Sequence, residues 1–282
     1  MKSGQVKRIR RDTKRLFLKK GTCSRALFFI MDREFGHPQD DEELAAELLA
    51  GGIVQQGYQC GLLWGAVFAV GAESFRRQPG RDRAVGTAIK AARHVNASFV
   101  ARAGSSDCYD ITSCEWKNKL SIAKYMLTGK FLSCFKLADA WAPEAIRAAK
   151  AGLALDPSDL PARPLSCASE VVRLSGGSDA EMVMAAGLAG GIGLSGGGCG
   201  ALAAAIWMNA LSRIRDKTYK TSISDPVAER ILRTFFEAAG SELDCRVIAK
   251  RSFATVADHT EFIEAGGCAQ LIQALAGAAS FR

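Results

Sequence analysis

Residues 50–61 read AGGIVQQGYQCG, and residues 189–200 read AGGIGLSGGGCG. Shifting the chain by 139 residues aligns residues 40–66 with residues 179–205 without a gap, and 13 of these 27 positions are identical. The identical residues of the first copy are Asp40, Glu42, Ala46, Leu49, Ala50, Gly51, Gly52, Ile53, Gly57, Cys60, Gly61, Leu63 and Ala66. Self-similarity at one fixed offset is the signature of a repeated unit, so the sequence indicates an internal duplication.

The second copy also contains GIGLSG at residues 191–196, which matches the G-x-G-x-x-G fingerprint of dinucleotide-binding folds. That fingerprint follows a β-strand, whereas the preceding EMVMAAGLA is Ala-rich and helix-like. The first copy keeps AGGI, the later glycine and the Cys-Gly pair, but it has no such fingerprint. We therefore interpret the match as a product of glycine richness and exclude a nucleotide site on this ground.

The same register pairs the cysteines. FVARAGSSDC (99–108) is similar to FEAAGSELDC (236–245), SCFKLADA faces GCAQLIQA, and TCSRALFF faces SCASEVVR. Eight of the nine cysteines then form two matching sets of four, Cys23, Cys60, Cys108 and Cys134 in the first copy and Cys167, Cys199, Cys245 and Cys268 in the second. Cys114 has no counterpart.

The apolar residues repeat with helical spacing. AIRAAKAGLAL, DDEELAAELLA, VAERILRTFFEAA and AQLIQALAGAA have apolar residues three to four apart, and strand-like alternation is scarce. DPSDLPARP (156–164) holds three of the seven prolines and indicates an extended linker. The prediction is an all-α chain of two tandem homologous helical domains packed as a pseudo-dimer: a basic tail (1–20), a first domain (21–155), a linker (156–166) and a second domain (167–282).

The net charge of +8 is concentrated at the N-terminus, where residues 1–20 hold nine Lys and Arg and one acid. The remaining residues carry equal numbers of basic and acidic side chains, and no basic patch extends the N-terminal charge. We therefore expect a solvated basic tail that is able to contact an acidic partner or surface. The pattern gives no strong nucleic-acid signal.

Two long uncharged windows, Leu48–Ala72 and Met182–Ser212, exceed the roughly 20 residues that span a bilayer. Glycines and amide side chains interrupt both, so we predict buried helices joined by glycine turns and not an integral membrane protein. The apolar run ALFFIM is too short for a signal peptide and leads into charged residues. We expect a cytoplasmic protein, in which many cysteines serve as metal ligands or redox groups.

No C-x-x-C or C-x-x-C-H motif occurs, so the local zinc-knuckle, thioredoxin and c-type haem signatures are absent from the sequence. Widely spaced cysteines would form a site only when several helices come together. Three chemistries remain open: an iron–sulfur cluster held by four thiolates, a zinc ion, or a metal-free dithiol–disulfide couple. Glycine lets backbone N–H groups approach a cofactor, and the candidate cofactor-binding positions are Gly52, Gly57, Gly61, Gly191, Gly196 and Gly200.

The pattern of one cysteine, a glycine-rich turn into C-G-A-x-x-G, and two further single cysteines resembles the redox-active C_GCAxxG_C_C family, whose relatives include the split-Soret cytochromes. The first copy matches with TCSRA, CGLLWG (60–65), Cys108 and Cys134, and the second with SCASE, CGALAA (199–204), Cys245 and Cys268. Leu62 and Ala204 each depart from the central motif. The resemblance implies an all-helical fold and a redox role with iron–sulfur clusters; the haem of the split-Soret relatives does not carry over.

Residues outside the quartets are expected to be structural. His37, His94 and His259 have no counterparts across the copies, so we predict that they are not ligands. Asp107 and Asp244 each precede a cysteine, where an Asx-type bond or an influence on proton uptake is expected. Trp64, Trp141 and Trp207 are expected in the core.

The sequence therefore predicts a redox protein that binds iron–sulfur clusters through the two cysteine quartets and transfers electrons with a redox partner protein. A zinc-stabilised structural or interaction protein and a metal-free thiol–disulfide oxidoreductase remain as alternatives. No serine–histidine–acid set or carboxylate pair suggests another catalytic site. Any enzymatic activity would be that of an oxidoreductase.

Overall fold

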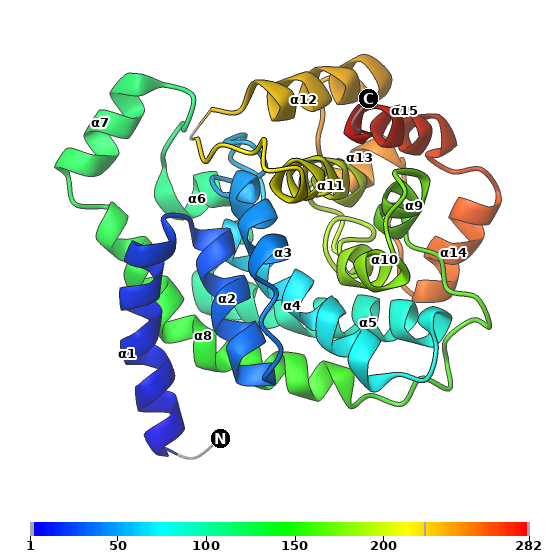
Figure 1. The fold of residues 1–282 in the computed structure, drawn as a ribbon, viewed down its shortest axis with the longest axis horizontal. Coiled ribbons are helices and arrows are strands. Elements are labelled where there is room, and N and C mark those ends of the chain that lie inside the picture. Colours follow the sequence, from blue (N-terminus) through cyan, green and yellow to red (C-terminus); the bar gives the residue numbers. More distant parts are fainter. Residues whose placement is uncertain (1–2, 223, 281–282) are drawn as a thin grey trace.

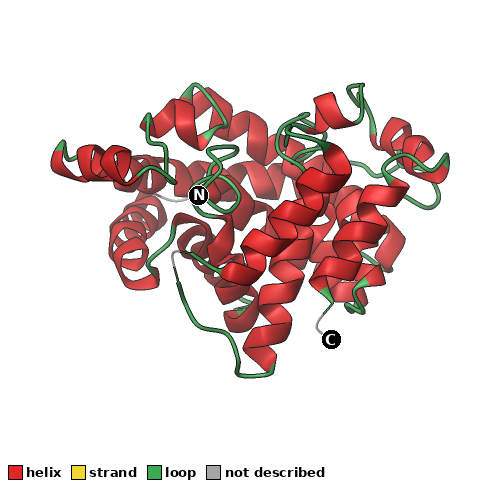
Figure 2. Cartoon of the chain, turned by 90° about the horizontal axis from the view of Figure 1, so that it is seen from above, coloured by secondary structure: helices red, strands yellow, loops and turns green. Residues whose placement is uncertain are grey.

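The computed structural model describes residues 3–222 and 224–280, and regular structure there consists of helices with two isolated β-bridges. The first copy comprises α2 (Cys23–Phe35), α3 (Asp40–Ala45), the 3₁₀ helix η1 (Ala46–Leu49), α4 (Gly61–Arg77), α5 (Arg81–Ala103), α6 (Cys108–Thr112), α7 (Lys119–Leu127) and α8 (Phe131–Leu153). The second comprises α9 (Cys167–Leu174), α10 (Asp179–Ala186), α11 (Gly200–Arg215), α12 (Pro226–Ala239), α13 (Cys245–Ile248), α14 (Val256–Glu264) and α15 (Ala269–Ala279). The all-α prediction is confirmed (Figure 2).

The two copies repeat the same helix packing in the same order. In the first copy α2 packs on α4, α4 on α5, and α5 on α8; in the second α9 packs on α11, α11 on α12, and α12 on α15. Each copy therefore has its own version of one helical arrangement, as a duplication requires.

The copies also exchange contacts reciprocally. Helix α10 of the second copy packs on α4 of the first, and α3 with η1 of the first copy packs on α11 of the second. Such reciprocal contact is the mark of a two-fold interface between like units. The central helices α4 and α11 lie among the helices of both copies (Figure 1). The two copies therefore pack as the predicted pseudo-dimer, and helices of each copy pack between helices of the other.

The core runs without interruption through both copies. Trp64, Trp141 and Trp207 are fully buried, which confirms the expectation for all three. The ring of Trp207 lies 4.6 Å from that of Phe68 in the other copy, and its indole N–H donates to the carbonyl of Glu42 at 3.1 Å. Burial of such large rings is a principal source of stabilisation, so neither copy is expected to be stable without the other.

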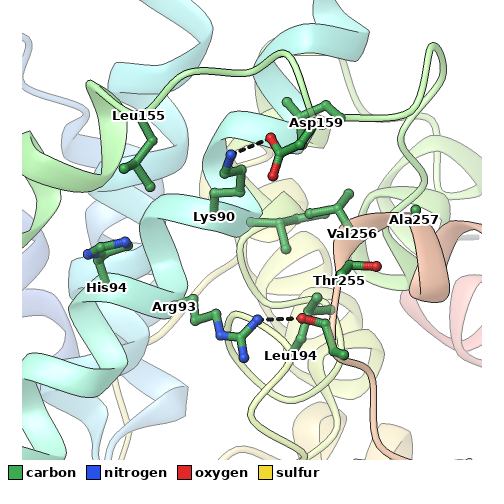
Figure 3. Close-up of a pocket in the computed structure, with 12 residues that line it drawn as sticks. Lys90, Arg93, His94, Leu155, Asp159, Leu194, Thr255, Val256 and Ala257 are labelled. Atoms are coloured by element: carbon green, nitrogen blue, oxygen red, sulfur yellow. Dashed lines mark hydrogen bonds and ion pairs between the residues drawn. The ribbon is translucent and has the colours of Figure 1, made fainter.

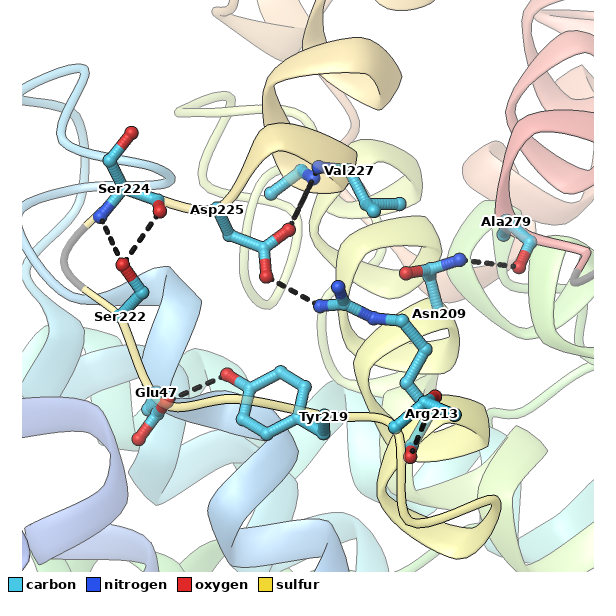
Figure 4. Close-up of polar contacts among 11 residues, drawn as sticks. Glu47, Asn209, Arg213, Tyr219, Ser222, Ser224, Asp225, Val227 and Ala279 are labelled. Carbon is cyan, nitrogen blue, oxygen red and sulfur yellow. Dashed lines mark hydrogen bonds and ion pairs between the residues drawn. The ribbon is translucent and has the colours of Figure 1, made fainter.

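Polar contacts reinforce this interface (Figure 4). The hydroxyl of Tyr219 donates to Glu47 of the first copy at 2.7 Å, and the guanidinium of Arg213 pairs with Asp225 at 2.6 Å. Arg213 and Asp225 are buried, where an ion pair is held only if both charges are matched. Tyr219, which follows α11, is thereby held against η1.

The basic N-terminal segment differs from the expected tail, because residues 3–20 form helix α1 (Ser3–Lys20), which packs on α8 and α2. Ile9 and Thr13 are buried, while Arg8 pairs with Glu34 of α2. The segment is highly charged but also has apolar residues at helical spacing, and these pack against the core. The expectation of a tail considered only the charge and therefore overlooked this apolar face.

The linker region crosses α5 without helix, from residue 154 to residue 166. Lys90 of α5 holds it through Asp159 at 2.5 Å, and Arg93 donates to the carbonyl of Ala254 (Figure 3). A cavity of about 290 Å³ lies between these elements and is lined also by His94. Cysteine does not contribute to its lining, so this cavity is separate from both quartets.

Candidate functional site

A left-handed turn precedes the second cysteine of each quartet. Residues 51–55 and residues 190–194 each have five successive positive φ angles, between 47° and 78°. Non-glycine residues in this conformation cost about 1–2 kcal/mol each, and Ile53 and Val54 are β-branched. The turn is closed by hydrogen bonds from Gly57 N to Gly51 O (2.9 Å) and from Gly196 N to Gly190 O (2.8 Å). The repeated AGGI sequence therefore forms a strained left-handed turn in each copy.

Glycine is required inside the turn. A Cβ at Gly52 would collide with the backbone of Tyr58, and a Cβ at Gly191 would collide with the backbone of Gly197. Both positions also have positive φ, so a side chain would add conformational strain to the collision. The segment leading to the cysteine therefore lies directly on the turn.

The same segment forms a two-residue backbone bridge. Gln59 pairs with Asp107 in the first copy, and Gly198 pairs with Asp244 in the second, both antiparallel. The amide of Cys108 donates to Tyr58 O and that of Cys245 to Gly197 O, each at 2.7 Å. The bridge brings the second and third cysteines of each quartet together, although they are more than 40 residues apart in sequence.

All eight cysteines lie at the N-terminal ends of helices. Cys23, Cys108, Cys167 and Cys245 are the first residues of α2, α6, α9 and α13; Cys60, Cys199 and Cys268 are the N-caps of α4, α11 and α15; Cys134 lies in the first turn of α8. Free N–H groups at a helix start favour the anionic form of a thiol. Each quartet therefore has the electrostatic surroundings of an anionic centre.

In the first copy the thiols of Cys23 and Cys60 lie close enough to shift each other's pKa. The Cys60 thiol and, to a smaller extent, the backbone of Gly51 lower the pKa of Cys23, while the Cys23 thiol and burial raise the pKa of Cys60 well above its usual range. A Cβ at Gly61 would collide with Cys23 Sγ, so the glycine of the Cys-Gly pair makes room for the partner thiol.

The other two thiols of the first quartet contact polar aromatic side chains. The indole N–H of Trp116 donates to Cys108 Sγ at 3.2 Å, and Tyr125 Oη lies 3.0 Å from Cys134 Sγ. The two rings pack edge to face, with centroids 5.0 Å apart. Burial raises the pKa of Cys108 to about 12 and also raises that of Cys134, and each aromatic hydrogen bond acts against this increase.

In the second copy all four cysteines line one small cavity of about 20 Å³, together with Phe253, Phe262 and His259. Burial raises the pKa of Cys167 to about 11, that of Cys199 to about 12, and those of Cys245 and Cys268 above their usual range. Backbone N–H donation from Gly190 to Cys167 corresponds to that from Gly51 to Cys23. This quartet is enclosed by apolar rings.

Two features of the site were not predicted. His259 lines the second cavity although it has no counterpart in the first copy; its Nδ1 lies 3.1 Å from Leu165 O, and burial lowers its pKa to about 4. The expected Asx-type bonds of Asp107 and Asp244 are not formed, because neither side chain caps the helix that follows. What repeats at these aspartates is the backbone bridge.

The remaining candidates take distinct places. Gly57 and Gly196 have positive φ beside Tyr109 and Arg246, and a Cβ at Gly200 would collide with Leu188 O. His37 is exposed after α2. Cys114 is buried, and Ser121 Oγ lies 3.9 Å from its sulfur. Among the candidate glycines, Gly61 thus abuts the Cys23 thiol, and Gly200 lines the cavity that the four cysteines of the second quartet share.

The approaches to the two quartets touch each other. The side-chain amide of Gln59, next to Cys60, donates to Gly191 O at 2.9 Å. A Cβ at Gly197 or Gly198, next to Cys199, would collide with or crowd this amide. Gly197 and Gly198 of the second copy thus leave space for the Gln59 side chain of the first. The hydrogen bond from Gln59 to Gly191 O joins the segments that lead to the two quartets.

The donor set fits a metal–sulfur centre in kind, because each quartet supplies four soft thiols at helix N-termini. Within residues 3–222 and 224–280, no group of three or more His, Cys, Asp or Glu side chains is positioned to hold a metal ion directly. The second cavity has room for roughly one water. Loading therefore requires the thiol side chains to rotate and to lose protons.

Among the described helices, none is long and apolar enough to cross a membrane. Neither a curated protein nor a solved structure matches the chain. A family model described as "Putative redox-active protein (C_GCAxxG_C_C)" matches twice, over residues 22–142 and 166–280. Each match spans one cysteine quartet with its glycine turn and bridge. The chain belongs to this redox-active C_GCAxxG_C_C family, as a tandem duplication of the family unit.

Proposed function

We propose that each cysteine quartet binds an iron–sulfur cluster and that the protein transfers electrons. The observation that carries this proposal is that each copy repeats one left-handed turn and one backbone bridge beside four cysteines at helix N-termini. A duplicated device of this kind indicates two centres of the same class in one rigid core. Membership of a redox-active family supports the role.

The protein residues would hold and tune such a centre. Four buried thiolates repel one another, so they are stable together only around a cation. Iron–sulfur clusters supply reversible one-electron chemistry when bound. Backbone N–H groups of residue 51 and residue 190 donate to Cys23 and Cys167, which stabilises bound sulfur in its more reduced state.

The test is purification without oxygen, followed by the visible spectrum and by iron, sulfide and zinc analysis. We expect iron and acid-labile sulfide in similar amounts with broad absorbance near 400 nm, a rough value for thiolate-to-iron charge transfer. The variants Cys60→Ser and Cys199→Ser should each lose about half of the iron, because each removes one centre. Cys114→Ser is the matched control and should lose none.

A colourless protein with zinc would instead indicate a zinc-stabilised structural or interaction protein, and the electron-transfer proposal would be abandoned. The same result follows if Cys60→Ser and Cys199→Ser leave the metal content unchanged. The twin variants thus test the assignment of each quartet separately.

A dithiol couple is the second candidate, and the position of Cys23 Sγ against Gly61, beside Cys60, favours it in the first copy. A low-pKa thiol beside a second thiol is the arrangement that attacks a disulfide. In the reduced, metal-free protein at pH 7, Cys23 should be alkylated first, at least about tenfold faster than any cysteine of the second quartet. Peptide mass spectrometry measures this order; earlier alkylation of Cys167 or Cys199 would contradict it.

A further inference from the structure

Helix α7 exposes an apolar face to solvent. Leu120 and Leu127 are 81% and 88% exposed, and Met126 is 51% exposed. Within this fully described helix only Tyr125 is buried. α7 projects from one end of the molecule (Figure 1). Leucines exposed to this extent on one short helix mark an interaction site more often than a random surface.

The surroundings of α7 are strongly basic. Residues 116–138 contain five lysines and no acid, a run that the neutral average of residues 21–282 conceals. The five are Lys117, Lys119, Lys124, Lys130 and Lys136, and all are exposed. Lys117 pairs with Glu229 at 3.4 Å; in the described part of the chain the other four form no ion pair. The apolar face is thus bordered by unpaired positive charge.

The buried side of α7 reaches the first quartet. Tyr125 of this helix contacts Cys134 Sγ, and Trp116, just before the helix, contacts Cys108 Sγ. Trp116 is partly exposed and lines an open cavity of about 400 Å³ with Tyr109 and Lys117. The exposed face of α7 and the thiols of the first quartet are therefore separated by the thickness of one helix.

The second copy has the opposite charge at the corresponding place. Residues 253–271, around α14, contain three acids and neither Lys nor Arg. The rings next to that quartet, Phe253 and Phe262, line a small cavity. α14 lies at the other end of the molecule from α7 (Figure 1). The corresponding segment of the second copy thus lacks the lysine cluster that surrounds α7.

We propose that α7 with its lysines (residues 117–130) is the docking surface for an acidic electron-transfer protein, which exchanges electrons with the first quartet. The proposal rests on the proposed function, since it needs a redox centre behind α7. One electron leaves the partner's reduced centre and enters the centre held by the first quartet, or the reverse, and no atom is transferred. Charge complementarity selects the partner, and the leucines bury its apolar contact.

Binding can be measured without relying on redox chemistry. The probe is a small acidic ferredoxin, and cytochrome c is the matched basic counter-probe. We expect the purified protein to bind the ferredoxin, with affinity falling as salt rises, and to bind cytochrome c more weakly. The triple variant Lys117→Gln, Lys119→Gln, Lys124→Gln and the double variant Leu120→Ser, Leu127→Ser should each weaken ferredoxin binding about tenfold.

The control removes the same charge elsewhere, in the variant Arg163→Gln, Arg173→Gln, Lys250→Gln, whose side chains are exposed on the linker and the second copy. It should bind as wild type does. Absent ferredoxin binding, or equal losses in the α7 variant and this control, would overturn the proposal. Binding of wild type, but not of the α7 variants, to vesicles of phosphatidylcholine and phosphatidylserine in place of ferredoxin would also overturn it, in favour of a membrane surface.

These experiments distinguish failure of the docking surface from failure of the iron–sulfur assignment. If the protein is colourless yet the α7 variants lose ferredoxin binding, the docking surface stands and the cluster assignment fails. If the protein is iron-loaded and ferredoxin reduces it at the same rate in wild type and the α7 variants, the docking surface fails and the cluster assignment stands.

Discussion

The two cysteine quartets have the same backbone and different linings. In each, a left-handed turn and an antiparallel bridge bring the second and third cysteines together at the N-terminal ends of two helices. Aromatic residues follow the third cysteine at identical spacing, Trp116 and Tyr125 after Cys108, and Phe253 and Phe262 after Cys245. The first pair gives hydrogen bonds to sulfur, whereas the second pair has no polar group to give.

The backbone therefore defines the position of each quartet, and the side chains around it set the properties of the sulfur atoms. Hydrogen bonds to sulfur favour the more negative, reduced state of a sulfur-ligated centre, and an apolar enclosure disfavours it. We therefore expect the first centre to have the higher reduction potential. An electron shared between the two would then reside mainly on the first.

The largest expected effect tests the common backbone. Gly52→Ala and Gly191→Ala should each lower the free energy of unfolding by about 3 kcal/mol or more, because a Cβ collides with backbone at a positive φ. Gly277→Ala, in a helix with open space around the Cβ, should instead be neutral or stabilise by about 0.5–1 kcal/mol. Urea unfolding measures all three; a large loss in only one copy would break the equivalence of the turns.

The next effect concerns a buried acid found only in the first copy. Burial, with Glu43 nearby, raises the pKa of Asp32 to about 9, and the segment SGGS (175–178) that follows the corresponding helix α9 of the second copy has no acid. Asp32 is therefore protonated in the folded protein at pH 7 but ionised in the unfolded chain. Its contribution to stability is fully present below pH 4 and is lost as pH rises towards 9, by up to about 1.4 kcal/mol per pH unit.

Asp32→Asn removes this loss, so the variant should gain stability over wild type progressively between pH 4 and pH 9. Thermal unfolding at several pH values measures the gain. Asp41→Asn, at an exposed position, is the control and should show no such trend. A constant difference between Asp32→Asn and wild type over this range would mean that Asp32 is ionised in the folded protein.

The smallest effect sharpens the comparison of linings. The double variant Trp116→Phe, Tyr125→Phe gives the first quartet the rings of the second, and it should lower the potential of that centre by about 59 mV or more, a tenfold change for one electron. The reverse exchange, Phe253→Trp with Phe262→Tyr, should raise the other potential if the new groups reach sulfur. Redox titration in a Cys199→Ser or Cys60→Ser background assigns each midpoint; unchanged midpoints would show that the aromatic groups only fill space.

Much of the site follows from the sequence because the duplication supplies an internal alignment. The register from AGGI pairs the cysteines, and the structure brings together the members of each predicted quartet. The same alignment also pairs the aromatic residues, since Trp116 and Phe253 each lie eight residues after the third cysteine. They were not predicted as part of the site because aromatic residues in apolar segments usually belong to the core. His259 gave no signal because it has no counterpart to align.

The duplication, the helical class, the family and the grouping of cysteines can be predicted from the chain alone, because they depend on periodicity and spacing along it. That the basic N-terminus is a packed helix, that the copies share one core, and that polar groups contact the sulfur atoms of one quartet but apolar rings line the other is visible only in the folded structure. These features depend on which residues meet across helices, as Trp207 meets Phe68 and Gln59 meets Gly191. Spacing along the chain does not encode such contacts, because burial and hydrogen bonding are properties of neighbours in space.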